Sequence, residues 1–179
     1  IFTLYYFSMI FFYVFFILFL CLVFTISSVV EFLRGNEKIS VAFLFTGTLL
    51  LGIHVSLINP YLNLWDEQFN ALVAKNTMNN FLKPMLYANP VLDYDYKDWA
   101  HNAVWLHKQP LFLWQMAISI KLFGVNEMAV RLPSIVMHAL MPLFIYRIGK
   151  ISFNSALGYY GALFFAVANY PLQLAVGIY

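Results

Sequence analysis

The sequence predicts an all-α membrane protein with about four transmembrane helices and amphipathic juxtamembrane helices in its first outer loop. Of its 179 residues, 63% are hydrophobic and only 10% are charged, whereas about a quarter of a soluble domain is charged. Residues 1–30 and 39–65 carry no Asp, Glu, Lys or Arg, and each stretch is long enough to be a membrane span. The net charge of +2 is small and dispersed, which argues against nucleic acid as a partner.

The first predicted helix covers residues 1–33 and is expected to be a permanent span. About 30 helical residues reach roughly 45 Å, which crosses a bilayer with some tilt. A cleaved signal peptide is the less favoured alternative, because the apolar region is too long and has no basic start. The connector that follows contains Arg34 and Lys38 and is expected in the cytoplasm by the positive-inside rule. A second span is predicted at 39–60.

Residues 61–127 form the predicted outer loop, in which charged side chains gather. After Asp66, residues at i, i+3, i+4 and i+7 follow the rhythm of an amphipathic helix, which we expect to lie along the membrane surface. These positions are Phe69, Leu72, Val73 and Asn76. The four tryptophans lie in or just beyond the charged part of the loop, as expected of rings at a bilayer interface. They are Trp65, Trp99, Trp105 and Trp114.

Residues 109–123 are apolar, but as a helix they reach only about 22 Å. The next basic cluster, Arg147 and Lys150, is also expected in the cytoplasm, so an even number of crossings must separate it from the first connector. The spans 39–60 and 128–148 already supply two crossings. We therefore predict that 109–123 is a juxtamembrane or partly inserted helix on the outer side.

The helix predicted at 128–148 has Asn126 as its expected N-cap. Glu127 and Arg131 stand four residues apart in the order that favours an ion pair on a helix. A last span is predicted at 155–176, with Pro171 marking its final turns.

Asp66 and Glu67 are the first candidates for chemistry. They can simply be a helix N-cap and an acidic first-turn residue, which stabilise a helix. Alternatively, Asp66 deprotonates or orients an acceptor nucleophile. Both interpretations can hold together, and because neighbouring helix residues point in different directions, we expect the two carboxylates to have different partners.

His107 and Lys108 are the second candidates. Lys108 is either an interfacial cation beside tryptophan rings or a contact for a lipid phosphate, which ammonium donors suit. Arg131 is the third candidate, and a structural partnership with Glu127 is its favoured interpretation. The sequence has no Gly-rich phosphate loop, no Cys/His metal pattern and no nucleophile elbow. It predicts no metal site, although it leaves a divalent metal requirement open.

Three motifs follow one another along the chain. They are Trp65-Asp66-Glu67, His107-Lys108-Gln109-Pro110-Leu111 with Trp114, and Phe123-Gly124-Val125-Asn126-Glu127 through Arg131-Leu132-Pro133-Ser134. Their order resembles the N-terminal part of the GT-C glycosyltransferases, and most of all the protein O-mannosyltransferase and aminoarabinose-transferase group, glycosyltransferase family 39. The resemblance divides the chain into an N-terminal helix with its connector, 1–38, and the first part of the transferase domain, 39–179. Gln109 stands where the family usually has a second proline.

The resemblance implies an enzyme that transfers a sugar from a polyprenyl-phosphate donor to a protein or glycolipid acceptor. Its site would face the periplasm or lumen, with a bacterial inner membrane as the expected location. By similarity Asp66 would be the catalytic carboxylate with Glu67 in support, and Lys108 with His107 would lie near the donor phosphate. Arg131 and its segment would form the helix behind the site. The remaining supporting residues would be Trp65 and Glu127.

The family's second acidic motif and its remaining spans would lie beyond Tyr179, so this piece alone is expected to be inactive. Two other functions stay open. The first is a transporter or flippase subunit for lipid-linked sugars, because membrane carboxylates also mark transport pathways. The second is a non-catalytic assembly subunit in which Asp66 only caps a helix.

Overall fold

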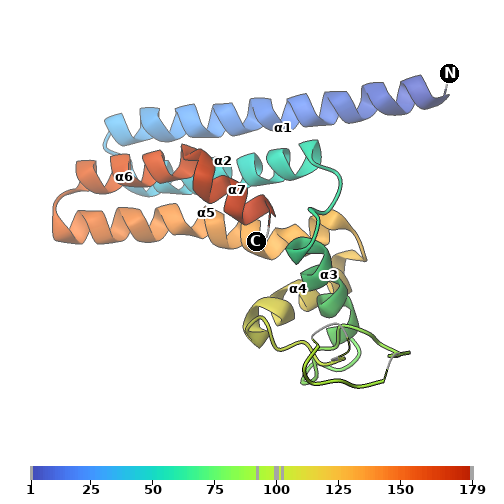
Figure 1. Cartoon of the computed structure of the whole chain (residues 1–179). Coiled ribbons are helices and arrows are strands. Elements are labelled where there is room, and N and C mark those ends of the chain that lie inside the picture. The colour runs from blue at the N-terminus through green and yellow to red at the C-terminus, as the bar shows by residue number, and fades with distance from the viewer. Residues whose placement is uncertain (1, 92, 99–100, 102, 178–179) are drawn as a thin grey trace. The chain divides into compact units, whose positions relative to one another are not determined.

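The computed structural model describes residues 2–91, 93–98, 101 and 103–177, and its regular elements in this part of the chain are seven α-helices (Figure 1). The predicted all-α class is confirmed. The helices are α1 (Phe2–Leu33), α2 (Glu37–Ile58), α3 (Asp66–Thr77), α4 (Pro110–Phe123), α5 (Glu127–Ser152), α6 (Ser155–Val167) and α7 (Asn169–Gly177). The chain divides into two compact units. Unit 1 comprises Ile1–Pro60 and Ser134–Val176, and unit 2 comprises Tyr61–Pro133 and Gly177–Tyr179.

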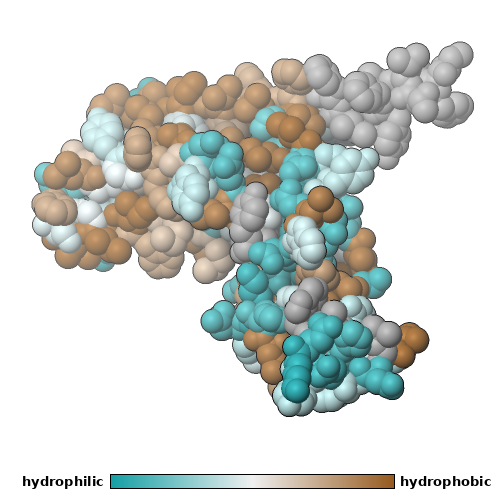
Figure 2. All heavy atoms as spheres, viewed as in Figure 1, coloured by the Kyte–Doolittle hydropathy of each residue, from teal (hydrophilic) through white to brown (hydrophobic). Residues whose placement is uncertain are grey.

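Three helices within the described residues are long and apolar enough to cross a membrane: α1 from Phe12 to Leu33, α2 and α5. The protein is therefore an integral membrane protein. The apolar helix α4 has 14 residues and is too short by the same measure, in agreement with the prediction that 109–123 does not cross. Figure 2 shows hydrophobic residues over much of the visible face of the unit 1 helices, whereas hydrophilic residues gather on unit 2.

The last predicted span is two helices rather than one. α6 ends at Val167, Ala168 has an extended conformation with φ −68° and ψ 129°, and α7 starts at Asn169. Pro171 accounts for the break, because it has no N–H to donate to the carbonyl of Val167 and its ring obstructs a continuing helix. In the first turn of α7 the same proline is tolerated, since that N–H would have no helical partner.

Buried hydroxyl groups join α1, α2 and α6 in unit 1. The Ser28 hydroxyl donates to the carbonyl of Ser40 at 2.8 Å and lies 2.8 Å from the Tyr159 hydroxyl, while the Ser40 hydroxyl donates to the carbonyl of Ser28 at 2.8 Å. All three side chains are buried. Because hydrocarbon offers no water to satisfy polar groups, hydroxyls inside a membrane bundle bond to one another across helices. The first helix is thereby a packed member of unit 1.

An ionic contact joins the start of α2 to the end of α5. The Glu37 carboxylate accepts a hydrogen bond from the Tyr146 hydroxyl at 2.7 Å and forms an ion pair with Lys150. The basic connector at Arg34 and the basic cluster at Arg147 therefore lie at the same end of unit 1. This is the arrangement that an even number of crossings between the two clusters requires.

Two glycines allow α5 and α6 to touch. A Cβ atom on Gly149 would lie 2.5 Å from the Cα of Gly158, and a Cβ on Gly158 would lie 2.6 Å from the carbonyl oxygen of Tyr146. Small residues at such positions let membrane helices approach closely enough for extensive packing. The contact between these helices therefore has no room for a side chain at either glycine.

We predict that Gly158→Ala lowers the thermal unfolding temperature of the purified protein in detergent. Overpacking of this kind typically costs about 1–3 kcal/mol. Gly161→Ala is the matched control, because a Cβ there would lie 3.6 Å from the Ile145 side chain, an ordinary contact. An alanine in a helix is otherwise about 0.5–1 kcal/mol better than a glycine. Equal unfolding temperatures for the two variants would contradict the close contact.

Candidate active site

Helix α3 packs against α4 inside unit 2. Its buried residues include Ala71, Val73 and Ala74, and these belong to the same core as Leu113 and Met116 of α4. The predicted apolar face is therefore divided, because Val73 is fully buried in protein whereas Leu72 is 38% exposed.

A strained turn at Trp65 sets the start of α3. Trp65 has φ 69° and ψ −103°, and it is the one non-glycine residue with positive φ in the described part of the chain. Such a conformation is a genuine outlier for a bulky residue and costs of order 1–3 kcal/mol. Trp65 occupies the N-cap position and makes no side-chain capping bond, so Asp66 is the first residue of the helix. The interpretation of Asp66 as an N-cap therefore lacks the expected geometry.

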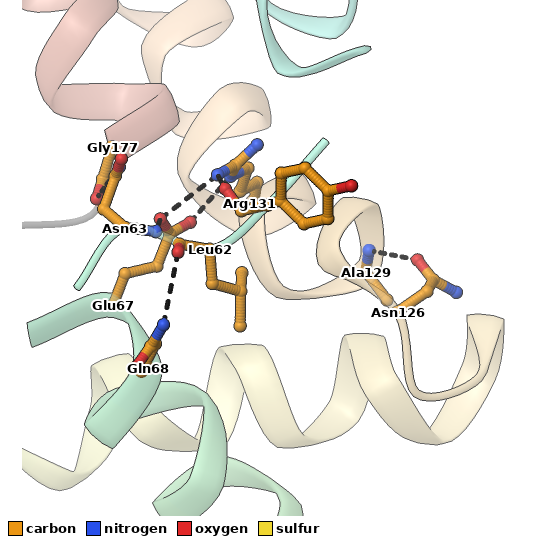
Figure 3. A network of polar contacts seen from close by, with 9 residues as sticks. Leu62, Asn63, Glu67, Gln68, Asn126, Ala129, Arg131 and Gly177 are labelled. Atoms are coloured by element: carbon orange, nitrogen blue, oxygen red, sulfur yellow. Dashed lines mark hydrogen bonds and ion pairs between the residues drawn. The ribbon is translucent and has the colours of Figure 1, made fainter. Parts of the chain in front are cut away.

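Glu67 and Arg131 form a buried ion pair (Figure 3). The guanidinium donates from Nε to Oε1 at 2.6 Å and from Nη2 to Oε2 at 3.1 Å. Both side chains are almost completely buried, Glu67 at 1% exposure and Arg131 at 0%. The same groups reach the backbone before α3, because Glu67 accepts from the Asn63 N–H at 2.6 Å and Arg131 donates to the Tyr61 carbonyl at 2.8 Å.

The predicted pairing of Arg131 with Glu127 is wrong. In the described part of the chain, the carboxylate partner of Arg131 is Glu67, and Glu127 is exposed at the start of α5. Helix spacing favoured Glu127, but a pair that is buried and bidentate is stronger than an exposed i, i+4 pair. The predicted N-cap of this helix is present, because the Asn126 side chain accepts from the Ala129 N–H at 2.8 Å (Figure 3).

Asp66 points to a different environment from Glu67, as expected of neighbouring helix residues. It lines a cavity of about 330 Å³, which we call the Asp66–Lys108 cavity. The other lining residues are Trp65, Phe69, Trp105, His107 and Lys108. The Asp66 side chain is exposed and makes no hydrogen bond or ion pair with any residue that the structure describes.

A loop closed by backbone hydrogen bonds brings Lys108 to this cavity. Met85 and Val104 form an antiparallel bridge, and the Trp105 N–H donates to the Pro84 carbonyl at 2.9 Å. Asn76 of α3 fixes the loop by donating to the carbonyl of Met85 at 3.0 Å. The side-chain amide of Asn76, a position that the amphipathic pattern assigned to the apolar face of the helix, is thus one of the anchors of this loop. Trp99 lies outside the described residues.

Aromatic rings build the walls of the cavity. Phe69 stacks on Trp105 with 5.8 Å between ring centroids, and the His107 ring lies 4.7 Å from that of Trp105. The Trp65 ring also lies beside Phe69, with 6.1 Å between the two ring centroids. Phe69 was expected only as part of an amphipathic pattern, and nothing in the sequence separated it from an ordinary apolar residue.

A second cavity of about 440 Å³ shares Trp105, His107 and Lys108 with the first. We call it the apolar cavity, because most of its remaining lining is apolar. These residues are Leu82, Pro84, Leu106, Gln109, Pro110 and Trp114. Trp114 is held in place by a hydrogen bond from its indole N–H to the Phe81 carbonyl at 2.6 Å. Gln109 has φ −64°, the value that a proline would fix, so the missing second proline does not alter the backbone there.

The structure thus brings four of the predicted site residues together and leaves three apart. Trp65, Asp66, His107 and Lys108 share a cavity. Glu67 and Arg131 form the buried pair, and Glu127 lines a third cavity. Within the described residues, no three His, Cys, Asp or Glu side chains are grouped so that they could hold a metal ion.

Comparison with known proteins gives one family match. Residues 107–177 match the family described as dolichyl-phosphate-mannose-protein mannosyltransferase. The matched segment starts at His107 and includes Lys108 and Arg131. No curated protein and no solved structure matches the chain. The match confirms the resemblance to GT-C glycosyltransferases that the motifs predicted.

We predict that Glu67→Gln lowers the unfolding temperature strongly, because it leaves the Arg131 charge buried without a counter-charge. Breaking a buried pair costs roughly 3–5 kcal/mol. Replacing both partners by apolar residues, Glu67→Leu with Arg131→Met, should recover much of that loss. The control is Glu127→Gln, which removes an exposed first-turn carboxylate at a cost of about 1 kcal/mol or less. A larger effect at Glu127 than at Glu67 would contradict the observed pairing.

Proposed function

We propose that this membrane glycosyltransferase transfers a sugar from a polyprenyl-phosphate donor to a hydroxyl group of a protein or glycolipid acceptor. Asp66 acts as the general base, and Lys108 binds the donor phosphate with His107 beside it. The observation that supports this most strongly is that Asp66 and Lys108, which lie far apart in the sequence, line one cavity. A base and a phosphate-binding cation on one cavity are the two groups that such a transfer needs.

Asp66 is suited to proton transfer because its carboxylate is not engaged by other described residues. In the proposed step, the acceptor oxygen bonds to the anomeric carbon of the sugar and its proton passes to Asp66. The bond between that carbon and the phosphate oxygen breaks, and the polyprenyl phosphate leaves with the electron pair. The Lys108 ammonium stabilises the negative charge that grows on the departing phosphate.

The two adjoining cavities suit the two halves of an amphiphilic donor. The sugar and phosphate fit the Asp66–Lys108 cavity, which carries the polar groups, and the first isoprene units fit the apolar cavity. Volumes of about 330 and 440 Å³ both fall within the roughly 300–1,000 Å³ that is typical of small-molecule sites. Lys108 lines both cavities, so it is suited to hold the phosphate that joins these two halves.

Glu67 and Arg131 act in this proposal as positioning residues rather than as groups that touch substrate. Their ion pair fixes the backbone on both sides of Trp65, and the turn at Trp65 directs Asp66 into the cavity. Glu127 lies outside this arrangement. In this proposal the exposed Asp66 carboxylate takes part in the reaction, and the buried Glu67 carboxylate keeps Asp66 in position.

We place the predicted outer loop, residues 61–127, on the non-cytoplasmic side, in the periplasm if the membrane is a bacterial inner membrane. The basic clusters at one end of unit 1 favour the cytoplasm for that end. The chain leaves unit 1 at Pro60, which follows the opposite end of α2. A transporter is less well supported, since Asp66 and Lys108 belong to unit 2 and lie outside the candidate spans.

We predict that Asp66→Asn in the full-length protein lowers kcat by about 10²–10⁴-fold, the usual contribution of a general base. The unfolding temperature should fall only slightly, because the exposed side chain has no described partner to lose and a first-turn carboxylate contributes about 1 kcal/mol or less. Asp66→Ser, which can cap a helix but cannot act as a carboxylate base, should be as inactive as Asp66→Asn. Asp93→Asn in an exposed loop is the control. Normal turnover by either Asp66 variant would exclude the proposed role.

We predict that Lys108→Gln raises the KM for the lipid-phosphate donor by about tenfold or more, because a charge-assisted hydrogen bond to the phosphate is lost. Lys108→Arg should restore part of the affinity. Lys83→Gln serves as control, since Lys83 is an exposed lysine of the same unit that lines neither cavity. A KM that changes for the acceptor alone would place the donor phosphate elsewhere.

A further inference from the structure

A third cavity in unit 2 is not used by the proposed transfer reaction. It has a volume of about 220 Å³ and lies among α3, the end of α4 and the start of α5. Its polar lining residues are Gln68, Lys75, Asn126 and Glu127, and the rest of its lining is apolar, including Leu72 and Val125. We call it the Lys75–Glu127 cavity. It shares no lining residue with the two cavities of the candidate active site.

The two opposite charges at this cavity are both available. Lys75 and Glu127 are exposed, and neither forms an ion pair or hydrogen bond with another residue that the structure describes. Lys75 and Glu127 also form no ion pair with each other, although both line this small cavity. A ligand that carries one negative and one positive group can therefore contact both without displacing an existing partner.

The apolar lining indicates which kind of ligand with one negative and one positive group can bind here. Exposed apolar side chains continue beyond the cavity at the end of α4 and the loop after it, namely Leu122 at 71%, Phe123 at 61% and Val125 at 63% exposure. In an integral membrane protein, such a patch beside a charged pair suits an amphiphile at the lipid–water boundary. A volume of about 220 Å³ is below the roughly 300 Å³ at which pockets for drug-sized ligands begin. This small cavity therefore suits a phospholipid headgroup better than a polyprenyl-phosphate sugar.

We propose that the Lys75–Glu127 cavity binds a phospholipid whose headgroup carries a phosphate and a primary ammonium group. Lys75 donates to the phosphate, and the Glu127 carboxylate accepts from the ammonium. The acyl chains leave along Leu72 and Val125. A primary ammonium is required, because a quaternary one has no N–H to donate to Glu127.

The test measures phosphatidylethanolamine retained by the full-length delipidated protein, by native mass spectrometry across a lipid titration in detergent. Phosphatidylethanolamine should bind more tightly than phosphatidylcholine or phosphatidylglycerol. Lys75→Gln and Glu127→Gln should each weaken its binding about tenfold, the effect of one lost charge-assisted hydrogen bond. Soluble phosphoethanolamine should not compete at matched concentration, because it lacks the apolar chains.

Two variants control for helix-end effects and for total charge. Lys121→Gln removes a last-turn lysine from α4, as Lys75→Gln does from α3, but Lys121 does not line the cavity. Asp93→Asn removes an exposed carboxylate elsewhere in unit 2. Neither should change lipid retention, and a loss of binding in Lys121→Gln equal to that in Lys75→Gln would show that the Lys75 effect is not specific to the cavity.

Three results would overturn the proposal. Equal binding of phosphatidylglycerol would show a site for any anionic headgroup, and equal binding of phosphatidylcholine would show that no primary ammonium is recognised. No preference among the lipids, together with a raised KM for a peptide acceptor in Lys75→Gln, would assign the cavity to the acceptor. Since lipid retention is measured without sugar transfer, the first two results are independent of the proposed reaction.

Discussion

The buried ion pair between Glu67 and Arg131 is the interaction on which unit 2 depends. Removing two charges from water costs several kcal/mol for each ion, and only complete pairing offsets that cost. Here the carboxylate accepts from two guanidinium nitrogens and from the Asn63 N–H, while the guanidinium also reaches the Tyr61 carbonyl. The pair therefore connects α5 to the backbone segment that leads into α3, and the geometry of the candidate site follows from this connection.

Because the ion pair fixes the backbone segment before α3, the protein can keep the strained conformation at Trp65. A bulky residue keeps positive φ only where its surroundings determine the conformation. The ion pair fixes the chain at Tyr61, Asn63 and Glu67, and Trp65 lies between these points. The outcome is that two neighbouring carboxylates have different environments. The Glu67 carboxylate is buried beside the Arg131 guanidinium, and the Asp66 carboxylate lines a cavity with aromatic walls.

The sequence predicted the class, the three long apolar helices and four of the six residues that line the Asp66–Lys108 cavity, because these depend on composition and on short motifs. It did not predict the partner of Arg131, since helix spacing identifies a neighbour on the same helix and cannot identify one from a distant segment. Pro171 was recognised, but its effect was underestimated, and it separates α6 from α7. The roles of Phe69 and Asn76 depend on contacts with the loop before α4, which no local periodicity encodes. The predicted boundary between 1–38 and 39–179 stays a prediction.

Trp105, His107 and Lys108 form a wall common to two cavities, and this has a consequence for ligand design. If the proposed donor binds across both cavities, its two halves contact the same three side chains, so their contributions to the binding free energy should not be additive. A single molecule that places one anion at Lys108, with a polar arm in one cavity and a hydrocarbon arm in the other, loses rotational and translational freedom only once. In the proposed reaction, such a molecule is a donor analogue with a central phosphonate at Lys108.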